Sequence, residues 1–531
     1  MKNTKLNKNV FLKFRIITIW FLVCFVFFIT EISFAQKGNK PMRIEISSKI
    51  DNNVFHLIPC KEKGALICFK SINRDNDGNI KWIFSLFNKQ MDEVWTKEIP
   101  LQKNVNYNKY ILNDEFAYIV FHNSEKKGSA KFNLQILKYS LSKQSFSLIS
   151  EIVPDKSELV DIKIYNDKAY LGFQMRKDKV ELSIVDLISG ELTKMPVVFK
   201  NKNVLSAISI NKKKNTVGIV LTNSESRKHY KMYLVEFALN GKLIRTTEIK
   251  TGKNNYVLNY ARLNSNINGE NILIGTYSIN SVNIKDLKNE EKIKSSGFYI
   301  SKVTENEQKY IKFYNFLDFE NFYGSQASRN IIMLKNKAKR QNKKNNDFSL
   351  NYNLIMHDVY ETDSSLLLIA ELYYQKYHTV TDFSYDYYGN SIPYTYQVFD
   401  GYSFFNTIIS GFDNEGNMQW NHGFEIRDII SFDITKHISS LIFDEDIMLA
   451  YNRSGQVASK MFYRDEVIGN LEYFNLESKY KKDFVLEEEN SNMIHWYNNY
   501  FLCFGYQLIR NNLIAKKNKR TVFYINKIRF N

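Results

Sequence analysis

The feature that most constrains this chain is a short apolar run that returns about every 50 residues. Each run is at most six residues long, and Asn, Asp, Gly or Lys usually stands just before it, as is typical of strands bounded by turns. One long gap follows residue 277. The runs are Ala65–Phe69, Phe116–Phe121, Ala169–Phe173, Thr216–Leu221, Ile272–Tyr277, Leu366–Ala370, Ile447–Tyr451 and Phe501–Tyr506.

A second pair of strands follows most of these runs. Leu182–Asp186 precedes Gly190–Leu192, and Tyr233–Phe237 precedes Asn240–Ile244, where Asn-Gly is a strong hairpin signal. A four-stranded antiparallel unit with this period is typical of a propeller blade. We therefore predict an all-β fold, a β-propeller of seven or eight four-stranded blades with one helical insertion. A pair of β-sandwiches is the alternative.

One eight-residue unit occurs twice. Asp75-Asn-Asp-Gly78-Asn-Ile-Lys-Trp82 returns as Asp413-Asn-Glu-Gly416-Asn-Met-Gln-Trp420, with conservative differences only. Two copies far apart predict the same structural place in two blades. Trp82 and Trp420 are then expected to be half buried against an outer hairpin.

This turn unit resembles those of secreted bacterial propellers of the quinoprotein-like and Asp-box kinds, in which an Asp and a Gly precede a packed Trp. The spacing departs from the Asp-box pattern, with two residues between Asp413 and Gly416 and three between Gly416 and Trp420. The resemblance implies a propeller fold, and no family function is carried over.

The N-terminus has the three parts of a signal peptide. Lys2 to Arg15 are basic, Ile16 to Ile29 are apolar, and Ser33-Phe34-Ala35 fits a cleavage site. Leu22-Val23 before Cys24 do not fit a lipoprotein signal. We predict a signal peptide at 1–35 and a propeller domain at 36–531, exported to the periplasm, the outer surface or the medium. No transmembrane segment is expected after cleavage, and an uncleaved anchor is the alternative.

No motif in the chain assigns a catalytic or metal site. Asn73, Asp75, Asp77 and Gly78 look like the start of a calcium loop, but its twelfth position is Phe84, so a self-capping turn is favoured. The eight histidines lack metal-site spacings, and no cofactor is expected. Propeller enzymes gather residues from separate blades, so this search does not exclude catalysis.

Three cysteines remain after the predicted cleavage. Cys60 and Cys68 flank a predicted turn, so a disulfide across a hairpin and two buried thiols are both open. Cys503 lies in an apolar run and is predicted to be a core residue, and the spacings do not make a zinc site.

The net charge is +17, or about +13 after cleavage. The lysines are spread along the chain, which favours a compositional bias over an anionic partner, and we expect no nucleic acid to bind. The exception is a basic insertion at about 317–350, with a helix predicted over Ser328–Lys344. It is either an arm for an anionic surface or a solvated insertion.

An aromatic hairpin is predicted at about 373–405. Tyrosine offers a flat apolar face and a hydroxyl, which suits sugar stacking and protein recognition. The predicted binding residues are Tyr385, Tyr387, Tyr388, Tyr394 and Tyr396. We predict a monomeric binding or scaffold protein whose partner is a protein or glycan of the cell envelope. An exported enzyme acting on a polysaccharide or glycoconjugate, with its site in the central funnel, is the alternative.

Overall fold

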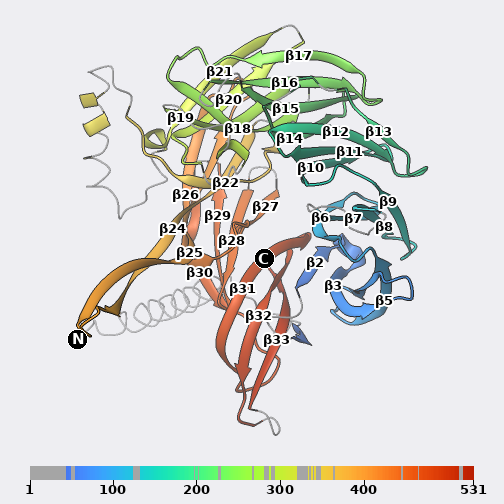
Figure 1. Ribbon diagram of the computed structural model, residues 1–531, viewed down its shortest axis with the longest axis vertical. Coiled ribbons are helices and arrows are strands. Elements are labelled where there is room, and N and C mark those ends of the chain that lie inside the picture. The colour runs from blue at the N-terminus through green and yellow to red at the C-terminus, as the bar shows by residue number, and fades with distance from the viewer. Residues whose placement is uncertain are drawn as a thin grey trace, which may run out of the picture.

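In a computed structural model, the chain folds into eight antiparallel sheets set around a common centre (Figure 1). The described residues are 43–48, 54–123, 132–196, 198–200, 202–224, 229–265, 268–279, 286–288, 293–305, 307–319, 333, 336–338, 340–341, 348–362, 365–443, 446–464, 466–513 and 518–530.

Each sheet is one blade, and the chain runs through each blade from the innermost strand outward. Blade 1 contains β2 (Phe55–Pro59), β3 (Ala65–Arg74), β4 (Ile80–Phe87) and β5 (Glu93–Leu101), and blade 2 contains β6 (Asn106–Leu112), β7 (Phe116–His122), β8 (Leu134–Ser140) and β9 (Phe146–Glu151). Blade 3 contains β10 (Ser157–Tyr165), β11 (Lys168–Met175), β12 (Lys179–Asp186) and β13 (Leu192–Lys194). Blade 4 contains β14 (Asn203–Asn211), β15 (Thr216–Ser224), β16 (Tyr230–Ala238) and β17 (Leu243–Ile249).

Blades 5 to 8 follow in the same order, except that the N-terminal strand completes the last one. Blade 5 contains β18 (Tyr256–Ser265), β19 (Asn271–Ile279), β20 (Gly297–Val303) and β21 (Gln308–Asn315), and blade 6 contains β22 (Asn353–Met356) with β23 (Tyr360–Glu361), β24 (Leu366–Tyr385), β25 (Ser391–Phe412) and β26 (Met418–Ser431). Blade 7 contains β27 (Ser439–Phe443), β28 (Asp446–Arg453), β29 (Gln456–Tyr463) and β30 (Glu466–Asn475). Blade 8 contains β31 (Phe484–Tyr497), β32 (Tyr500–Arg510), β33 (Lys519–Arg529) and β1 (Arg43–Ser47). Short 3-10 helices are η1 (Lys61–Lys63), η2 (Asp286–Lys288) and η4 (Phe316–Asp318).

The hydrophobic core is divided among the eight interfaces between adjacent blades. One cluster joins blades 1 and 2, the next joins blades 2 and 3, and so on round to a cluster of Phe55, Trp496 and Phe523 that joins blade 8 to blade 1. These clusters show a closed ring, which confirms the predicted β-propeller, and eight is the higher of the two predicted blade numbers.

The eight apolar runs found in the sequence are the second strands of the eight blades. β3, β7, β11, β15, β19, β24, β28 and β32 each contain one of them. A second strand has a neighbour on both edges and a blade against both faces, so nearly every side chain is buried. The sequence of such a strand is therefore a continuous apolar run, without the alternation of apolar and polar residues that a half-exposed strand has.

Polar side chains reinforce the interfaces close to the centre. Asp161 of β10 accepts a hydrogen bond from Lys109 Nζ of blade 2 at 3.2 Å and from Ile208 N of blade 4 at 3.0 Å. Between blades 8 and 1, Trp496 Nε1 donates to the backbone oxygen of Gly64 at 2.8 Å. These bonds satisfy buried donors and hold neighbouring inner strands in register.

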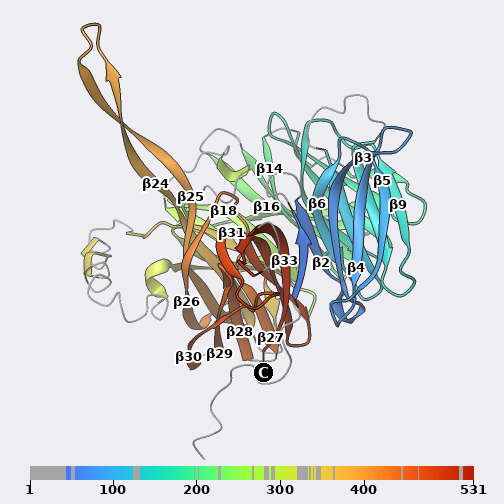
Figure 2. The same cartoon turned by 90° about the horizontal axis from the view of Figure 1, so that it is seen from below.

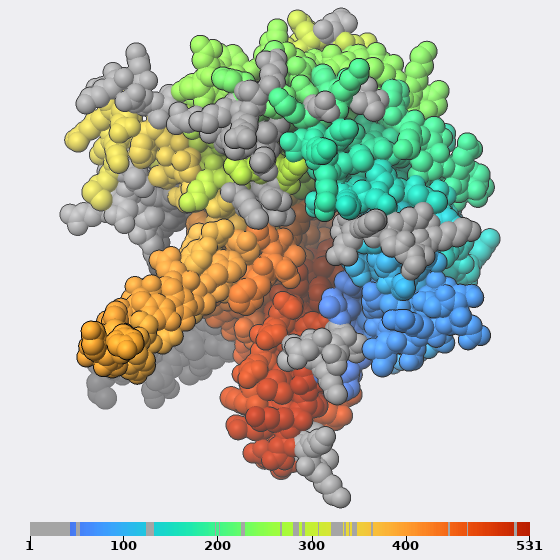
Figure 3. Space-filling model, viewed as in Figure 1, coloured from blue at the N-terminus to red at the C-terminus, as the bar shows by residue number. Residues whose placement is uncertain are grey.

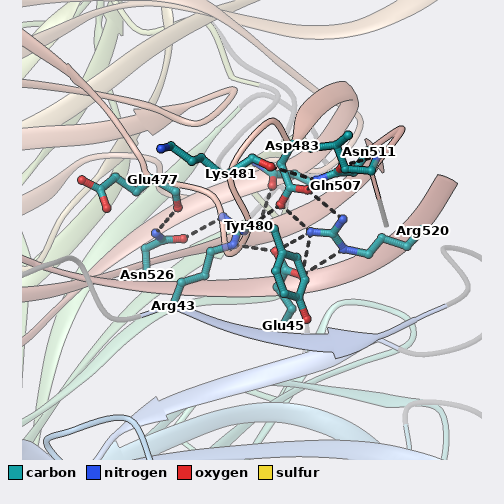
Figure 4. A network of polar contacts seen from close by, with 11 residues as sticks. Arg43, Glu45, Glu477, Tyr480, Lys481, Asp483, Gln507, Asn511, Arg520 and Asn526 are labelled. Atoms are coloured by element: carbon teal, nitrogen blue, oxygen red, sulfur yellow. Dashed lines mark hydrogen bonds and ion pairs between the residues drawn. The ribbon is translucent and has the colours of Figure 1, made fainter. Parts of the chain in front are cut away.

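A buried charged network fastens β1 to the last blade (Figure 4). Arg43 donates to Asn526 and Gln507, and Arg520 bridges Glu45 and Asp483. Burial opposes ionisation of Asp483, yet hydrogen bonds from Arg520 and Asn511 hold its pKa below the usual range. This network of charged bonds between the first strand and the last blade keeps the ring closed.

The repeated turn is present, but its predicted place is wrong. In both copies the Asp side chain accepts from the backbone N–H groups two and four residues on, at 2.7 to 3.0 Å. The Asp75 copy joins the second and third strands of blade 1, whereas the Asp413 copy joins the third and fourth strands of blade 6. In each copy the Gly takes a positive φ, as this type of hairpin turn requires. The unit therefore predicts the type of hairpin and does not predict which strands of the blade it joins.

The two tryptophans differ accordingly. Trp82 lies in β4 and is 2% exposed, whereas Trp420 lies in the outer strand β26, is half-buried and packs over Gly411. Cys60 and Cys68 are free buried thiols, and β3 pairs Cys68 with His56 and not with Cys60. Cys503 is a core residue, as predicted.

Part of the predicted insertion is described. Residues 333, 336–338 and 340–341 are helical, within the predicted helix, and the rest of that helix lies outside the described residues, as does the predicted signal peptide. Among the residues that are described, no helix has the length and the apolar content to cross a bilayer.

Candidate functional site

The second and third strands of blade 6 continue far beyond the blade as a two-stranded ribbon. The inner strand β22 pairs with β24 only as far as Tyr373, and the outer strand β26 pairs with β25 only from Tyr402. β24 and β25 nevertheless stay paired to Tyr385 and Ser391. Residues 374–401 thus form a ribbon that projects from the body (Figures 2 and 3).

Apolar side chains lie on both faces of the ribbon. The register puts Tyr377, Phe383, Tyr385, Pro393 and Phe399 on one face, and Val380, Ile392, Tyr394, Tyr396 and Val398 on the other. Tyr394 and Tyr396 stack with ring centroids 6.0 Å apart, and the Tyr394 hydroxyl donates to Asp382 at 3.3 Å. We name the first set face 1 and the second face 2.

A rigid turn ends the ribbon. Asp386 accepts from Tyr388 N at 2.9 Å and from Asn390 N at 2.7 Å, and Gly389 takes a φ of 79°. Hydrogen bonds, first from the Asn390 side chain and then from these backbone groups, lower the pKa of Asp386. This is a third copy of the Asp-Gly-Asn turn, and it holds Tyr387 and Tyr388 97% and 85% exposed at the tip.

All five predicted binding residues lie on this ribbon. Tyr385, Tyr387 and Tyr388 are at the tip, whereas Tyr394 and Tyr396 are on face 2. The boundaries predicted at 373 and 405 are close to those of the free ribbon. Tyr373 and Phe404 lie within the predicted bounds, but they are core residues at 1% and 2% exposure because blade 7 covers them.

The ring of inner strands carries a second candidate, a group of charges from four blades. Asp358 follows β22 in blade 6, and its side chain reaches solvent although protein atoms surround it on most sides. Burial opposes its ionisation, but Lys436, Arg262 and Lys163, from blades 7, 5 and 3, together hold the pKa of Asp358 below its usual range. Sequence reasoning missed this group because its members are far apart in the chain and share no motif.

A buried acid lies next to that group. Glu371 of β24 is fully buried and accepts hydrogen bonds from His357 Nε2 at 2.6 Å and from the backbone N–H groups of His437 and Ile438 at 3.0 Å. These donors hold its pKa low against the effect of burial. Glu371 therefore joins blades 6 and 7 as a fixed anion.

The chemistry available at the centre is therefore limited. Asp358 is kept ionised by cations, so it is a poor proton donor. Across the part of the chain that the structure describes, no group of three or more His, Cys, Asp or Glu side chains is arranged to hold a metal ion. The central charges favour ion pairing or anion contact more than acid–base catalysis.

No family model and no curated protein matches the chain. Among solved structures, Sqt1 of Saccharomyces cerevisiae is 11% identical with a TM-score of 0.41, covering 92% of this chain and 99% of that one. The WD40 domain of SCAP from fission yeast is 7% identical with a TM-score of 0.39, covering 92% and 98%. The polysaccharide lyase Uly1 is 10% identical with a TM-score of 0.37, covering 80% and 89%. What this chain has in common with them is the fold alone.

Proposed function

We propose that the protein is an exported binding protein of the cell envelope, and that its aromatic ribbon engages a partner protein. The observation that carries this proposal is the exposure of apolar side chains on both faces of residues 374–401. An isolated two-stranded hairpin is marginally stable in water, and exposed apolar patches of this kind mark interaction sites.

A protein partner fits the ribbon better than a glycan does. A sugar needs one aromatic platform, and Tyr394 and Tyr396 on face 2 supply it. That platform leaves face 1 and the tip unexplained, whereas a protein can cover both faces and the backbone between them. The propeller is then a rigid support that holds the ribbon away from the body.

The test is binding to envelope fractions of the host. The triple variant Tyr385→Ser, Tyr387→Ser and Tyr388→Ser is compared with a control that replaces two exposed isoleucines outside the ribbon, Ile72→Ser and Ile188→Ser. We expect binding to fall only in the tyrosine variant, and to disappear when the fraction is treated with protease. Binding that survives protease but not periodate would point to a glycan, and equal binding by both variants would contradict the proposal.

Export is a separate part of this proposal. The mature protein recovered from the host is expected to begin at or near Gln36. Recovery of the intact N-terminus from the cytoplasm would contradict it.

An enzyme acting on a polysaccharide or glycoconjugate is the second candidate. The observation that bears on it is the set of cations around Asp358, since Lys163, Arg262 and Lys436 suit contact with an anionic sugar chain. Asp358→Asn distinguishes the two candidates. Loss of polysaccharide cleavage with unchanged thermal stability would support the enzyme, whereas unchanged envelope binding supports the binding protein.

A further inference from the structure

The ribbon has two outer edges that pair with no other strand in the described part of the chain. Among the described residues, no strand pairs with β24 beyond Tyr373 or with β25 before Tyr402, except for the pairing between these two strands. Each edge therefore presents backbone N–H and C=O groups along residues 377–385 and 391–399. Such a row is a template for a further strand.

The tip determines which backbone groups point outward. Asp386 N donates to Asn390 O at 3.0 Å, which makes this pair hydrogen-bonded. In an antiparallel ladder, hydrogen-bonded and non-hydrogen-bonded residue pairs alternate. Counting from the tip toward the body, the next hydrogen-bonded pair is therefore Ser384 with Ile392, and every second pair after it is also hydrogen-bonded. The residues between them turn both backbone groups outward. On β24 these are Tyr377, Thr379, Thr381, Phe383 and Tyr385.

The two edges are not equivalent. Pro393 pairs with Phe383, so it is one of the outward-facing positions of β25, and proline has no N–H to donate. A strand added along β25 would lose a bond in the middle of the ladder. The edge of β24 has no proline over the same length. Its Phe383 N donates to the neighbouring Asp382 side chain at 2.8 Å, which leaves the outward N–H groups of Tyr377, Thr379, Thr381 and Tyr385 for an added strand.

The charge of the ribbon is opposite to that of the rest of the chain. Residues 374–401 contain three acids, Asp382, Asp386 and Asp400, and one lysine, Lys376, in a chain of net charge +17. His378 pairs with Asp400 at 2.5 Å, whereas Asp382 lies mid-ribbon on β24. A strand beside β24 would place a side chain next to Asp382, where a cation is favourable.

We infer that the outer edge of β24, from Tyr377 to Tyr385, takes up an extended cationic segment of the partner protein as an added strand. This inference rests on the proposed function and names the mode and chemistry of binding. Main-chain bonds give the affinity, and basic side chains next to Asp382 and apolar ones over the two faces give the preference. A second copy of this chain is disfavoured as the partner, because two ribbons that each carry three acids and one lysine would repel one another.

A pair of threonines provides a matched test. Thr381 and Thr395 are cross-strand partners at a pair that faces outward, so each points its N–H to a different edge. Thr381→Pro removes a donor from the proposed edge, and Thr395→Pro removes one from the opposite edge. Neither N–H belongs to the ladder between β24 and β25, so both variants are expected to fold, which circular dichroism and thermal melting check.

The probe is a fluorescent peptide of alternating valine and lysine, titrated into the full-length protein and followed by anisotropy. We expect Thr381→Pro to weaken binding by about tenfold, the equivalent of one lost hydrogen bond, while Thr395→Pro leaves it unchanged. A peptide of alternating valine and glutamate, and the lysine peptide with every second amide methylated, should bind more weakly than the original.

The opposite results are equally clear. Equal binding by the two proline variants, or by the lysine and glutamate peptides, would overturn the inference, as would no binding of the lysine peptide to the wild type. Concentration-dependent dimers that Thr381→Pro abolishes would identify a second copy as the partner and would also overturn it. If the tyrosine triple variant loses the envelope partner while Thr381→Pro keeps it, the proposed function stands and strand addition fails.

Discussion

The two halves of strand β24 lie in different environments, although the backbone continues as one strand. Residues 366–373 are all buried: Leu366, Leu368 and Ala370 pack toward blade 5, whereas Leu367 and Ile369 pack toward blade 7. Residues 374–385 are almost all exposed. The first half is apolar apart from Glu371, because two blades cover it. Among the described residues, no blade covers the second half, so folding alone does not explain its aromatic side chains, and the proposed partner would account for them.

The largest contrast is expected between two acids on this strand. Glu371→Ala leaves three buried donors without an acceptor and should reduce the free energy of unfolding by about 3–5 kcal/mol. Asp382→Ala on the ribbon should change it by less than about 0.5 kcal/mol. Denaturant unfolding followed by fluorescence measures both. Similar losses in the two variants would mean that the ribbon is packed as firmly as the blade.

The two tryptophans sharpen the same contrast between covered and uncovered positions. Trp82 is enclosed between blades 1 and 2, so Trp82→Ala should cost about 3–5 kcal/mol. Trp420 is half-buried on an outer strand, so Trp420→Ala should cost about half as much or less. Unfolding midpoints of the two variants give the comparison. A larger loss at Trp420 would contradict the assignment of these residues to different strands of their blades.

A smaller change in the free energy of unfolding is expected when the pH is lowered, and it arises from two histidines in the blades. Burial lowers the pKa of His56 and His122 to about 4. The unfolded chain binds protons at these side chains below about pH 6.5 while the folded chain does not. The free energy of unfolding should therefore be level above that pH and fall as the pH drops toward 4.

The depressed pKa of Glu371 adds to this loss only below the usual glutamate range, because the ionised form is the one that the fold stabilises. The double variant His56→Phe and His122→Phe should flatten the decline between about pH 6.5 and 4. A decline of unchanged slope in that variant would show that other groups carry the pH dependence.

The blade architecture could be predicted from the sequence because the second strand of each blade is buried on both faces. That burial produces the eight apolar runs, Ala65–Phe69 among them, at nearly regular spacing. The place of the Asp75 and Asp413 turns could not be predicted, since the side chain of Asp bonds to its own turn and carries no information about which two strands the turn joins.

The same distinction holds for the sites. The aromatic ribbon is a local feature of composition and length, so Tyr385 to Tyr396 could be located from the sequence. The charges around Asp358 come from four blades that meet only after the ring has closed. The open edge of β24 could not be predicted from the sequence either, because it depends on the register between β24 and β25 and on the residue at which β22 ends.

Hydrogen exchange of individual amides along β24 tests the central claim most directly. In the free protein, the amide of Ile369 should exchange slowly, and the outward amides of Tyr377, Thr379 and Thr381 should exchange fast. Adding the valine–lysine peptide should slow the outward amides and leave Ile369 unchanged. If the amide of Thr381 is already as slow as that of Ile369 without peptide, the protein covers its own ribbon, and the account of an open docking strand is contradicted.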